Sequence, residues 1–409
     1  MLDYRLIDCA WSRQSIRWCF LISILSVFLT FPFLTLCLIL SILVLLSAKY
    51  ESGRVANLSF CLLSAVVLAP LIATKLPLDR LGNDKAQYLS FMNIMGASGV
   101  REFLKVQPEL LSFSAIFLAW KIAGPTDVAF FLLFVVFFLL ALLAVWRADY
   151  RAVPLFLIIT LASSAFYSSY GNVIRQAMAF PFIFLLAQEK KRKYMLMFAF
   201  LATIAHIPSL MVTMPYVLYR FFGRLVIWPI GVLSGIIFIF SKFFVQGLSV
   251  LGGDGGGYLS KKAEIYTNWN SFSVIGVVIM TLAIALVNNI VWKRVLGSHK
   301  FDDESIGRGL VYQLLCFSNF CLFPIFATLS LSKVVERVYI YFFVISIFYL
   351  SVAIPKIRSD MWKFVACLAI VAYSAFGISK NLLAQDLLYG GQTDKYVTGN
   401  LIEIYEFVF

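Results

Sequence analysis

Three polar residues at helical spacing stand at the start of an apolar stretch in the middle of this chain. Asn172, Arg175 and Gln176 occupy positions i, i+3 and i+4, so an α-helix would direct all three side chains the same way. Arginine in or near a bilayer is costly and usually marks a pathway or a site. Its planar guanidinium matches pairs of phosphate oxygens and stays charged when partly buried. This cluster is therefore the strongest indication of function in the sequence.

Three further groups of polar residues accompany this cluster. They are Asp84 with Tyr88 one helical turn later, His206, and Glu336-Arg337 with Tyr341 one turn later. A carboxylate or an imidazole could take the proton from an attacking hydroxyl, while arginines bind a diphosphate. Each residue also has an ordinary structural interpretation, such as a helix cap, a packing ion pair or an interfacial aromatic. The functional hypothesis requires all four groups to lie on one face of the membrane.

The elements that must position these groups are membrane helices. Of the 409 residues, 61% are hydrophobic and 13% are charged, whereas soluble domains are nearer one half apolar and one quarter charged. Many apolar runs approach or exceed the roughly 20 residues that cross a bilayer. We predict an all-α polytopic integral membrane protein, one integral domain over residues 1–409, with about 11 to 13 transmembrane helices.

Basic residues indicate how these helices are oriented. The net charge of +13 is better explained by cytoplasmic turns rich in lysine and arginine than by nucleic-acid binding. Such turns fall near residues 147–151, 190–193, 220–224, 293–308 and 356–363. Their placement in the cytoplasm puts residues 167–176, the turn at His206 and residues 333–337 on the outer face. It also requires residues 194–219 to form a short hairpin at His206, and the alternative is one long helix with His206 in mid-membrane.

The polar segments define the remaining parts of the chain. We expect residues 75–126 to form an outer-face loop with a re-entrant or interfacial helix, residues 247–271 a flexible outer loop, and residues 379–409 a C-terminal tail. The glycine-rich run at 252–257 lacks the lysine and Ser/Thr of a phosphate-binding loop. Neither the seven cysteines nor the few outer aspartates suggest a metal site, so we expect no metal and no other cofactor.

At these positions the chain resembles the O-antigen polymerases (Wzy) and the EpsG-type exopolysaccharide polymerases. Six segments agree with that family in order and spacing, and the NxxRQxxA element followed by a histidine is the most specific part. The segments are GNDKAQY (82–88), PELLSF (108–113), NVIRQAMA (172–179), EKKRK (189–193), HIPS (206–209) and RVYIYF (337–342).

The resemblance implies a reaction and a setting. The fold expected from it is a GT-C-like polymerase or ligase architecture with a cavity at the periplasmic face of the bacterial inner membrane. The enzyme would be a glycosyltransferase that moves a glycan from one undecaprenyl pyrophosphate carrier to the non-reducing end of another lipid-linked repeat unit. Its partners would be the undecaprenyl-pyrophosphate-linked oligosaccharide, membrane lipid, a chain-length regulator and a flippase, with no nucleic acid.

The resemblance also suggests roles for single residues. Arg175 and Arg337 would bind the donor pyrophosphate and stabilise the leaving group. Either His206 or Asp84 would be the general base for the acceptor hydroxyl, with His206 preferred. The residues expected to bind or orient the substrate are Asn172, Gln176, Tyr88, Tyr341 and Glu336.

Other functions remain open on sequence grounds. A lipid-linked glycan flippase would also need arginines near a pyrophosphate, but it should distribute charges through the membrane and show repeat symmetry. An O-antigen ligase would use the same donor but usually carries a large outer loop, whereas the loop at 247–271 is modest. A structural scaffold would not need the Arg-Gln-His-Arg set.

Overall fold

The computed structural model describes residues 25–47, 53–77, 84–99, 109–251, 273–296, 306–384 and 388–409, with a few single residues between them. Within these ranges every element is a helix and no strand occurs. The predicted class, an all-α polytopic membrane protein, is confirmed. The glycine-rich run at 252–257, most of the predicted loop at 247–271, and Gly82-Asn83 of the first motif lie outside the described residues.

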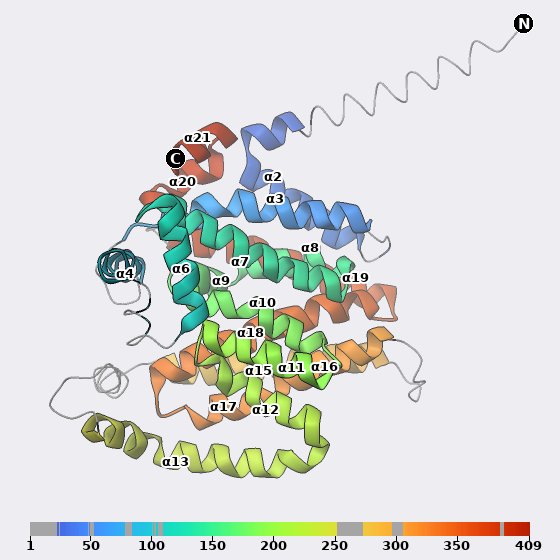
Figure 1. Ribbon diagram of the computed structural model, residues 1–409. Coiled ribbons are helices and arrows are strands. Elements are labelled where there is room, and N and C mark those ends of the chain that lie inside the picture. Colours follow the sequence, from blue (N-terminus) through green and yellow to red (C-terminus); the bar gives the residue numbers. More distant parts are fainter. Residues whose placement is uncertain are drawn as a thin grey trace, which may run out of the picture.

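Long apolar helices form a bundle (Figure 1). Its main members are α2 (Pro32–Leu46), α3 (Arg54–Ala73), α7 (Asp127–Ala148), α8 (Val153–Ala162), α10 (Ile174–Gln188), α11 (Arg192–Ala205), α12 (Ser209–Phe222), α13 (Ile227–Leu251), α15 (Ser273–Leu296), α16 (Ile306–Phe320), α18 (Ser332–Ala353) and α19 (Asp360–Ala384). Shorter pieces connect them: η1 (Tyr150–Ala152), α9 (Ser164–Gly171), η2 (Gly223–Val226), α17 (Leu322–Ala327) and η3 (Ile354–Lys356). The core between the helices is aliphatic and aromatic, as where Phe134 and Phe138 of α7 pack against Tyr170 of α9 with ring centroids 5.2 Å apart.

Fewer helices are long enough to cross a membrane than the 11 to 13 that we expected from the sequence. Among the described residues, seven helical stretches meet the length and hydropathy needed for a span, or eight if the pair Tyr150–Ala162 and Ser164–Gly171, bent by 81°, is one span. Three further apolar helices, Pro32–Leu46, Leu110–Ala123 and Ile174–Gln188, have only 14 or 15 residues. At about 1.5 Å per residue such a helix is about 21–23 Å long, shorter than the ~30 Å hydrocarbon core.

The chain reverses between two short helices at His206. Helices α11 and α12 contain 14 residues each and contact one another. His206 ends α11 with extended backbone angles (φ −156°, ψ 108°), and Pro208 precedes the first residue of α12. A residue before proline disfavours the helical conformation, which explains a break at Ile207. The predicted break is confirmed, and the alternative of one uninterrupted helix is wrong.

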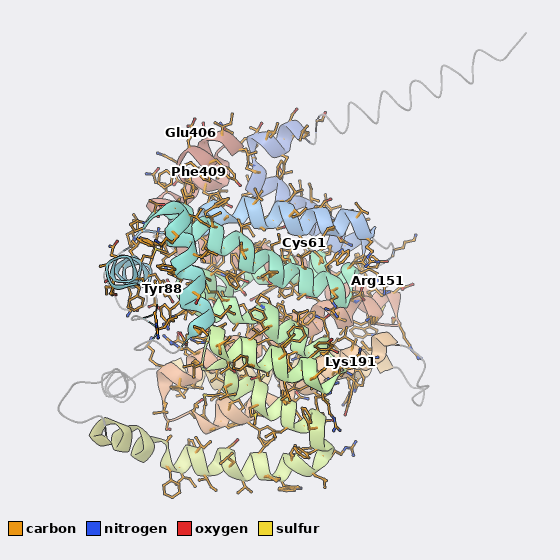
Figure 2. All side chains as sticks on the ribbon, in the orientation of Figure 1. Cys61, Tyr88, Arg151, Lys191, Glu406 and Phe409 are labelled. Atoms are coloured by element: carbon orange, nitrogen blue, oxygen red, sulfur yellow. The ribbon has the colours of Figure 1, made fainter. Side chains whose placement is uncertain are left out.

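The two ends of the bundle differ in charge. At one end Lys356 Nζ lies 3.4 Å from Asp149 Oδ2, and Arg220 donates a hydrogen bond to the Glu189 carbonyl (3.1 Å), so several basic turns meet there. Figure 2 shows Arg151 and Lys191 at this end and Tyr88 at the other. The basic turns and the residues around Tyr88 are therefore separated by the length of the bundle helices.

Two helices lie across the end that carries Tyr88. In Figure 1, α6 (Leu110–Ala123) crosses the bundle helices and α4 (Lys85–Ser98) is seen end-on. An interfacial helix would take this position, and the assignment of residues 75–126 to an outer loop stays a prediction.

The C-terminal segment packs at the same end of the bundle. It consists of η4 (Leu388–Gly391), α20 (Thr393–Thr398) and α21 (Leu401–Glu406). The N–H of Gly390 donates to the Thr74 carbonyl (2.9 Å), and the Tyr396 hydroxyl donates to the Val67 carbonyl (2.6 Å). The tail is thereby fastened to the end of α3 that faces Tyr88.

This arrangement predicts that Lys191 and Glu406 lie on opposite sides of the membrane, because they lie at opposite ends of the bundle. We expect a membrane-impermeant maleimide to label Glu406→Cys in whole cells and Lys191→Cys only after permeabilisation, with the unsubstituted protein as the background control. Labelling of both positions from the same side would contradict the arrangement.

Candidate functional site

Arg175 is the centre of a buried polar network. It is the second residue of α10 and is only 5% exposed. Its Nη1 forms an ion pair with Glu109, which directly precedes α6, and its Nε donates to the Tyr88 hydroxyl (3.3 Å). The guanidinium also lies over the rings of Tyr88 and Phe113, at 5.8 and 5.2 Å from their centroids. Residues from α4, α6 and α10 thus meet around one positive charge.

Glu109 extends the network to the turn between α11 and α12. Its Oε1 accepts the backbone N–H of Ile207 (3.1 Å) and lies 4.0 Å from Nε2 of His206. The broken helix leaves the Ile207 N–H without an intrahelical acceptor, so the carboxylate satisfies it. His206 Nδ1 and the Tyr341 hydroxyl of α18 lie 2.7 Å apart, and all three side chains are buried. Glu109, His206 and Tyr341 form a carboxylate–imidazole–phenol array.

Gln176 and Arg337 border this array. Gln176 donates to the backbone carbonyl of Arg337 (2.9 Å) and so connects α10 to α18, while its own buried Oε1 has no hydrogen-bond partner among the described residues. The Arg337 side chain is partly exposed and lies one turn before Tyr341. Glu336 is also partly exposed, with Lys333 3.5 Å from its carboxylate. The guanidinium of Arg337 is therefore more accessible than that of the buried Arg175.

A second polar group lies beside the first and includes two lysines. Lys75 donates to Asn172 Oδ1, and Lys85 Nζ contacts Asp127 Oδ1 (2.6 Å). Asp84, the N-cap residue of α4, is partly exposed and interacts electrostatically with Lys75. This lysine group therefore contains two of the predicted residues, Asp84 and Asn172.

The structure brings most of the predicted residues to one end of the bundle. Tyr88, Arg175, His206 and Tyr341 belong to the connected network, with Gln176 and Arg337 at its border. Asp84 and Asn172 lie in the lysine group, and Glu336 faces Lys333. Burial raises the pKa of Tyr88 to about 12, so this phenol is neutral at ordinary pH. The functional roles of all these residues stay predictions.

Sequence reasoning missed Glu109, Lys75 and Lys85 as members of the site. Glu109 did carry a signal, because it is an acidic residue directly before an apolar run in a chain with only 21 acidic residues. The lysines had no such signal, since basic residues at helix ends are common in membrane proteins. In the described residues no group of three or more His, Cys, Asp or Glu side chains is placed to hold a metal ion.

A large apolar cavity lies away from the Arg175 network. Its volume is about 740 Å³, and it is lined by Phe28, by Leu63, Val66 and Val67 of α3, and by the C-terminal residues Leu401, Ile402, Tyr405, Glu406 and Phe409. The lining is almost wholly apolar, so this cavity suits hydrocarbon and not sugar or phosphate. Beside the network itself lies a small cavity, bordered by Tyr88, Lys85 and Asn172.

The fold and the site define a multi-pass membrane protein with a buried Arg-Glu-His-Tyr network at one end of its helix bundle. The model of the EpsG family matches residues 60–393, which is most of the chain, and the chain belongs to that family. Membership indicates a function of the polysaccharide-polymerase type, consistent with a glycosyltransferase-like enzyme. No curated protein sequence and no solved structure matches the chain. The likeness to EpsG-type polymerases is confirmed, and the likeness to O-antigen polymerases stays a prediction.

The buried ion pair predicts a strong and asymmetric effect on stability. We expect Glu109→Gln to lower the free energy of unfolding by about 3–5 kcal/mol, because it leaves the Arg175 charge buried without its carboxylate. The double variant Glu109→Gln/Arg175→Met should lose clearly less, since no unpaired charge remains. Thermal unfolding of the purified proteins in detergent measures both.

Glu336→Gln is the matched control for that experiment. Its carboxylate is partly exposed, so the loss should stay within about 0.5 kcal/mol. Equal losses for the single and the double variant would show that the charge balance at Arg175 does not matter.

Proposed function

We propose that this protein polymerises lipid-linked oligosaccharide repeat units. It transfers the glycan from one undecaprenyl pyrophosphate carrier to the non-reducing end of another, at the periplasmic face of the bacterial inner membrane. The observation that carries the proposal is the buried Glu109–His206–Tyr341 array, held by Arg175 at the bundle end opposite the basic turns. Membership of the EpsG family supplies the reaction class.

The depth of the network supports chemistry on a lipid-linked substrate. Helix α10, of 15 residues, ends at the basic Glu189–Lys193 turn, and helix α11, of 14 residues, begins there. Their far ends therefore lie about 21–23 Å from that turn, within a hydrocarbon core of ~30 Å. A site at this depth, below α4 and α6, lies just inside the outer interface. The diphosphate and the first sugar of a lipid carrier lie in the polar interface next to that level.

His206 is the general base in this proposal. The acceptor hydroxyl gives its proton to the imidazole while its oxygen attacks the anomeric carbon of the donor glycan. The bond between that carbon and the pyrophosphate oxygen breaks, and the pyrophosphate leaves with the electron pair. The Glu109 carboxylate, 4.0 Å from Nε2, stabilises the imidazolium, and Tyr341 orients the ring through Nδ1. Because His206 is only 1% exposed, substrate entry must move the helices that cover it.

Arg175 and Arg337 have different roles in this proposal. Arg175 is buried against Glu109 and acts by holding that carboxylate, so it is a positioning residue. Arg337 is partly exposed and lies one turn before Tyr341, and it is the arginine that binds the leaving pyrophosphate. Asp84 lies in the lysine group and remains the alternative base.

The distribution of charge favours a polymerase over a flippase. The middle sections of α3, α7, α10 and α18 contain no charged residue. Between α15, α16 and α18 the buried polar contacts are neutral, with Asn288 donating to Ser318 and Ser346 at 3.0 Å each. A transporter for a charged headgroup would need compensating charges along its path.

A test with defined substrate separates these functions. The purified protein should convert a lipid-linked repeat unit into a ladder of longer products, as expected for a polymerase. His206→Gln should lower the rate at least ~100-fold, because the proton acceptor is lost, while Asp84→Asn keeps most of the activity. Arg175→Ala, if still inserted, should also abolish long chains.

The same assay can also contradict the assignment of His206 as the base or the polymerase function itself. A normal ladder from His206→Gln together with its loss in Asp84→Asn would assign the base to Asp84. Transfer of a single unit to lipid A core, with no ladder, would identify a ligase. Lipid movement without any new product would identify a flippase.

A further inference from the structure

Lys75 is a buried lysine with unused hydrogen-bonding capacity. It follows the last turn of α3 and is 2% exposed. An ammonium group carries three N–H donors, and the described residues offer Lys75 Nζ one acceptor, Asn172 Oδ1. Gly171 lies beside this lysine, since a Cβ built on Gly171 would lie 3.9 Å from Nζ, an ordinary contact distance. Within the described part of the chain, two N–H groups of Lys75 therefore have no acceptor and can donate to a ligand.

The neighbouring lysine has no such capacity. Lys85 Nζ donates to the carbonyls of Ala73 (2.7 Å) and Lys75 (2.6 Å) and to Asp127 Oδ1 (2.6 Å). It neutralises Asp127 and closes the C-terminal end of α3, where free carbonyls favour a cation. The role of Lys85 is therefore structural, in contrast to that of Lys75.

Lys75 lies next to the network and to a small cavity. Asn172, which accepts a hydrogen bond from Lys75, borders this cavity together with Lys85 and with Tyr88, whose hydroxyl accepts from Arg175. A group in this cavity would therefore meet Asn172, to which Lys75 donates its hydrogen bond.

Charge balance points to the chemistry of such a group. Arg175 is paired with Glu109 and Lys85 with Asp127, so these two pairs leave no net charge. A diphosphate brought to this depth needs cations that are not already neutralised, since a buried charge without partners is costly. Lys75 has no ion pair within 4 Å among the described residues, and only the partly exposed Asp84 acts on it electrostatically, so Lys75 supplies one such cation. Arg337 supplies another from α18.

We propose that Lys75 and Asn172 form a subsite for one phosphate of a lipid diphosphate, in which Lys75 Nζ donates to a phosphate oxygen. This subsite rests on the proposed function and adds to it the residues that recognise the carrier. The cavity is too small for a whole diphosphate, so a single phosphate oxygen enters it while the other phosphate faces Arg337. Lys75 thereby distinguishes a diphosphate from a monophosphate.

Equilibrium binding of farnesyl diphosphate to the purified full-length protein tests the subsite. We expect Lys75→Met to weaken this binding about 10- to 100-fold, the effect of one charge-assisted hydrogen bond. Farnesyl monophosphate should bind weakly to both proteins, and Lys75→Arg should recover most of the affinity. Inorganic pyrophosphate, measured in parallel, shows how much of the affinity is due to the headgroup alone.

The pH dependence gives a second readout. Burial lowers the pKa of Lys75 to about 8, while the Asp84 charge opposes this shift and the Lys85 charge adds to it. Burial raises the pKa of the neighbouring Tyr88 to about 12, so Tyr88 stays neutral over the pH range of the experiment. Lys75 is charged below pH 8, so diphosphate binding should weaken above it, by up to about tenfold per pH unit. Lys75→Arg should remove this dependence between pH 7 and 9.5, because arginine stays charged.

Lys356→Met is the matched control, because Lys356 is a lysine paired with Asp149 at the opposite end of the bundle. It should leave diphosphate affinity unchanged. Equal affinity of Lys75→Met and the unsubstituted protein, or no binding by either, would overturn the subsite. Lysine-dependent binding without a product ladder would support the subsite and refute the polymerase.

Discussion

The buried ion pair between Arg175 and Glu109 is the interaction on which the rest of the site depends. Two charges at this depth are stable only when they face each other and when their remaining hydrogen-bonding groups are satisfied. The Tyr88 hydroxyl accepts a hydrogen bond from Arg175, and the Ile207 N–H donates one to Glu109. Since Ile207 belongs to the turn that holds His206, the same carboxylate fixes the imidazole. One ion pair thus joins α4, α6, α10 and the α11–α12 turn.

Helix length is the second constraint, because it sets the depth of the site. Helices of 14 or 15 residues are shorter than the ~30 Å hydrocarbon core, and their ends leave backbone groups that must find partners. The short helices α10, α11 and α12 bring such ends to one level, and the crossing helix α6 supplies Glu109. A polar site below the interface is therefore a consequence of short helices closed by a covering element.

The C-terminal segment adds a feature that family membership does not account for. The family match ends at residue 393, whereas α21 spans Leu401–Glu406 and borders the large apolar cavity with α3. Phe131 of α7 packs against Tyr405 and Phe409 of this segment, while its neighbour Phe130 borders the small polar cavity. Helix α7 thus contacts both the C-terminal segment that lines the apolar cavity and the small polar cavity.

The sequence by itself determined the helical membrane class, the basic turns and most residue types of the site, and it favoured a break at His206 over one long helix. These follow from local quantities: hydropathy, spacing along a helix and the conformational effect of Pro208. It did not determine the number of spans, because composition does not distinguish a 14-residue crossing helix from a membrane-spanning one. Nor did it show which polar side chains contact one another. Arg175 pairs with Glu109, 66 residues away in the chain, and Lys75 donates to Asn172, 97 residues away. Only the packing of helices decides such pairs, because a helical sequence fixes the direction of a side chain but not the neighbour that it faces.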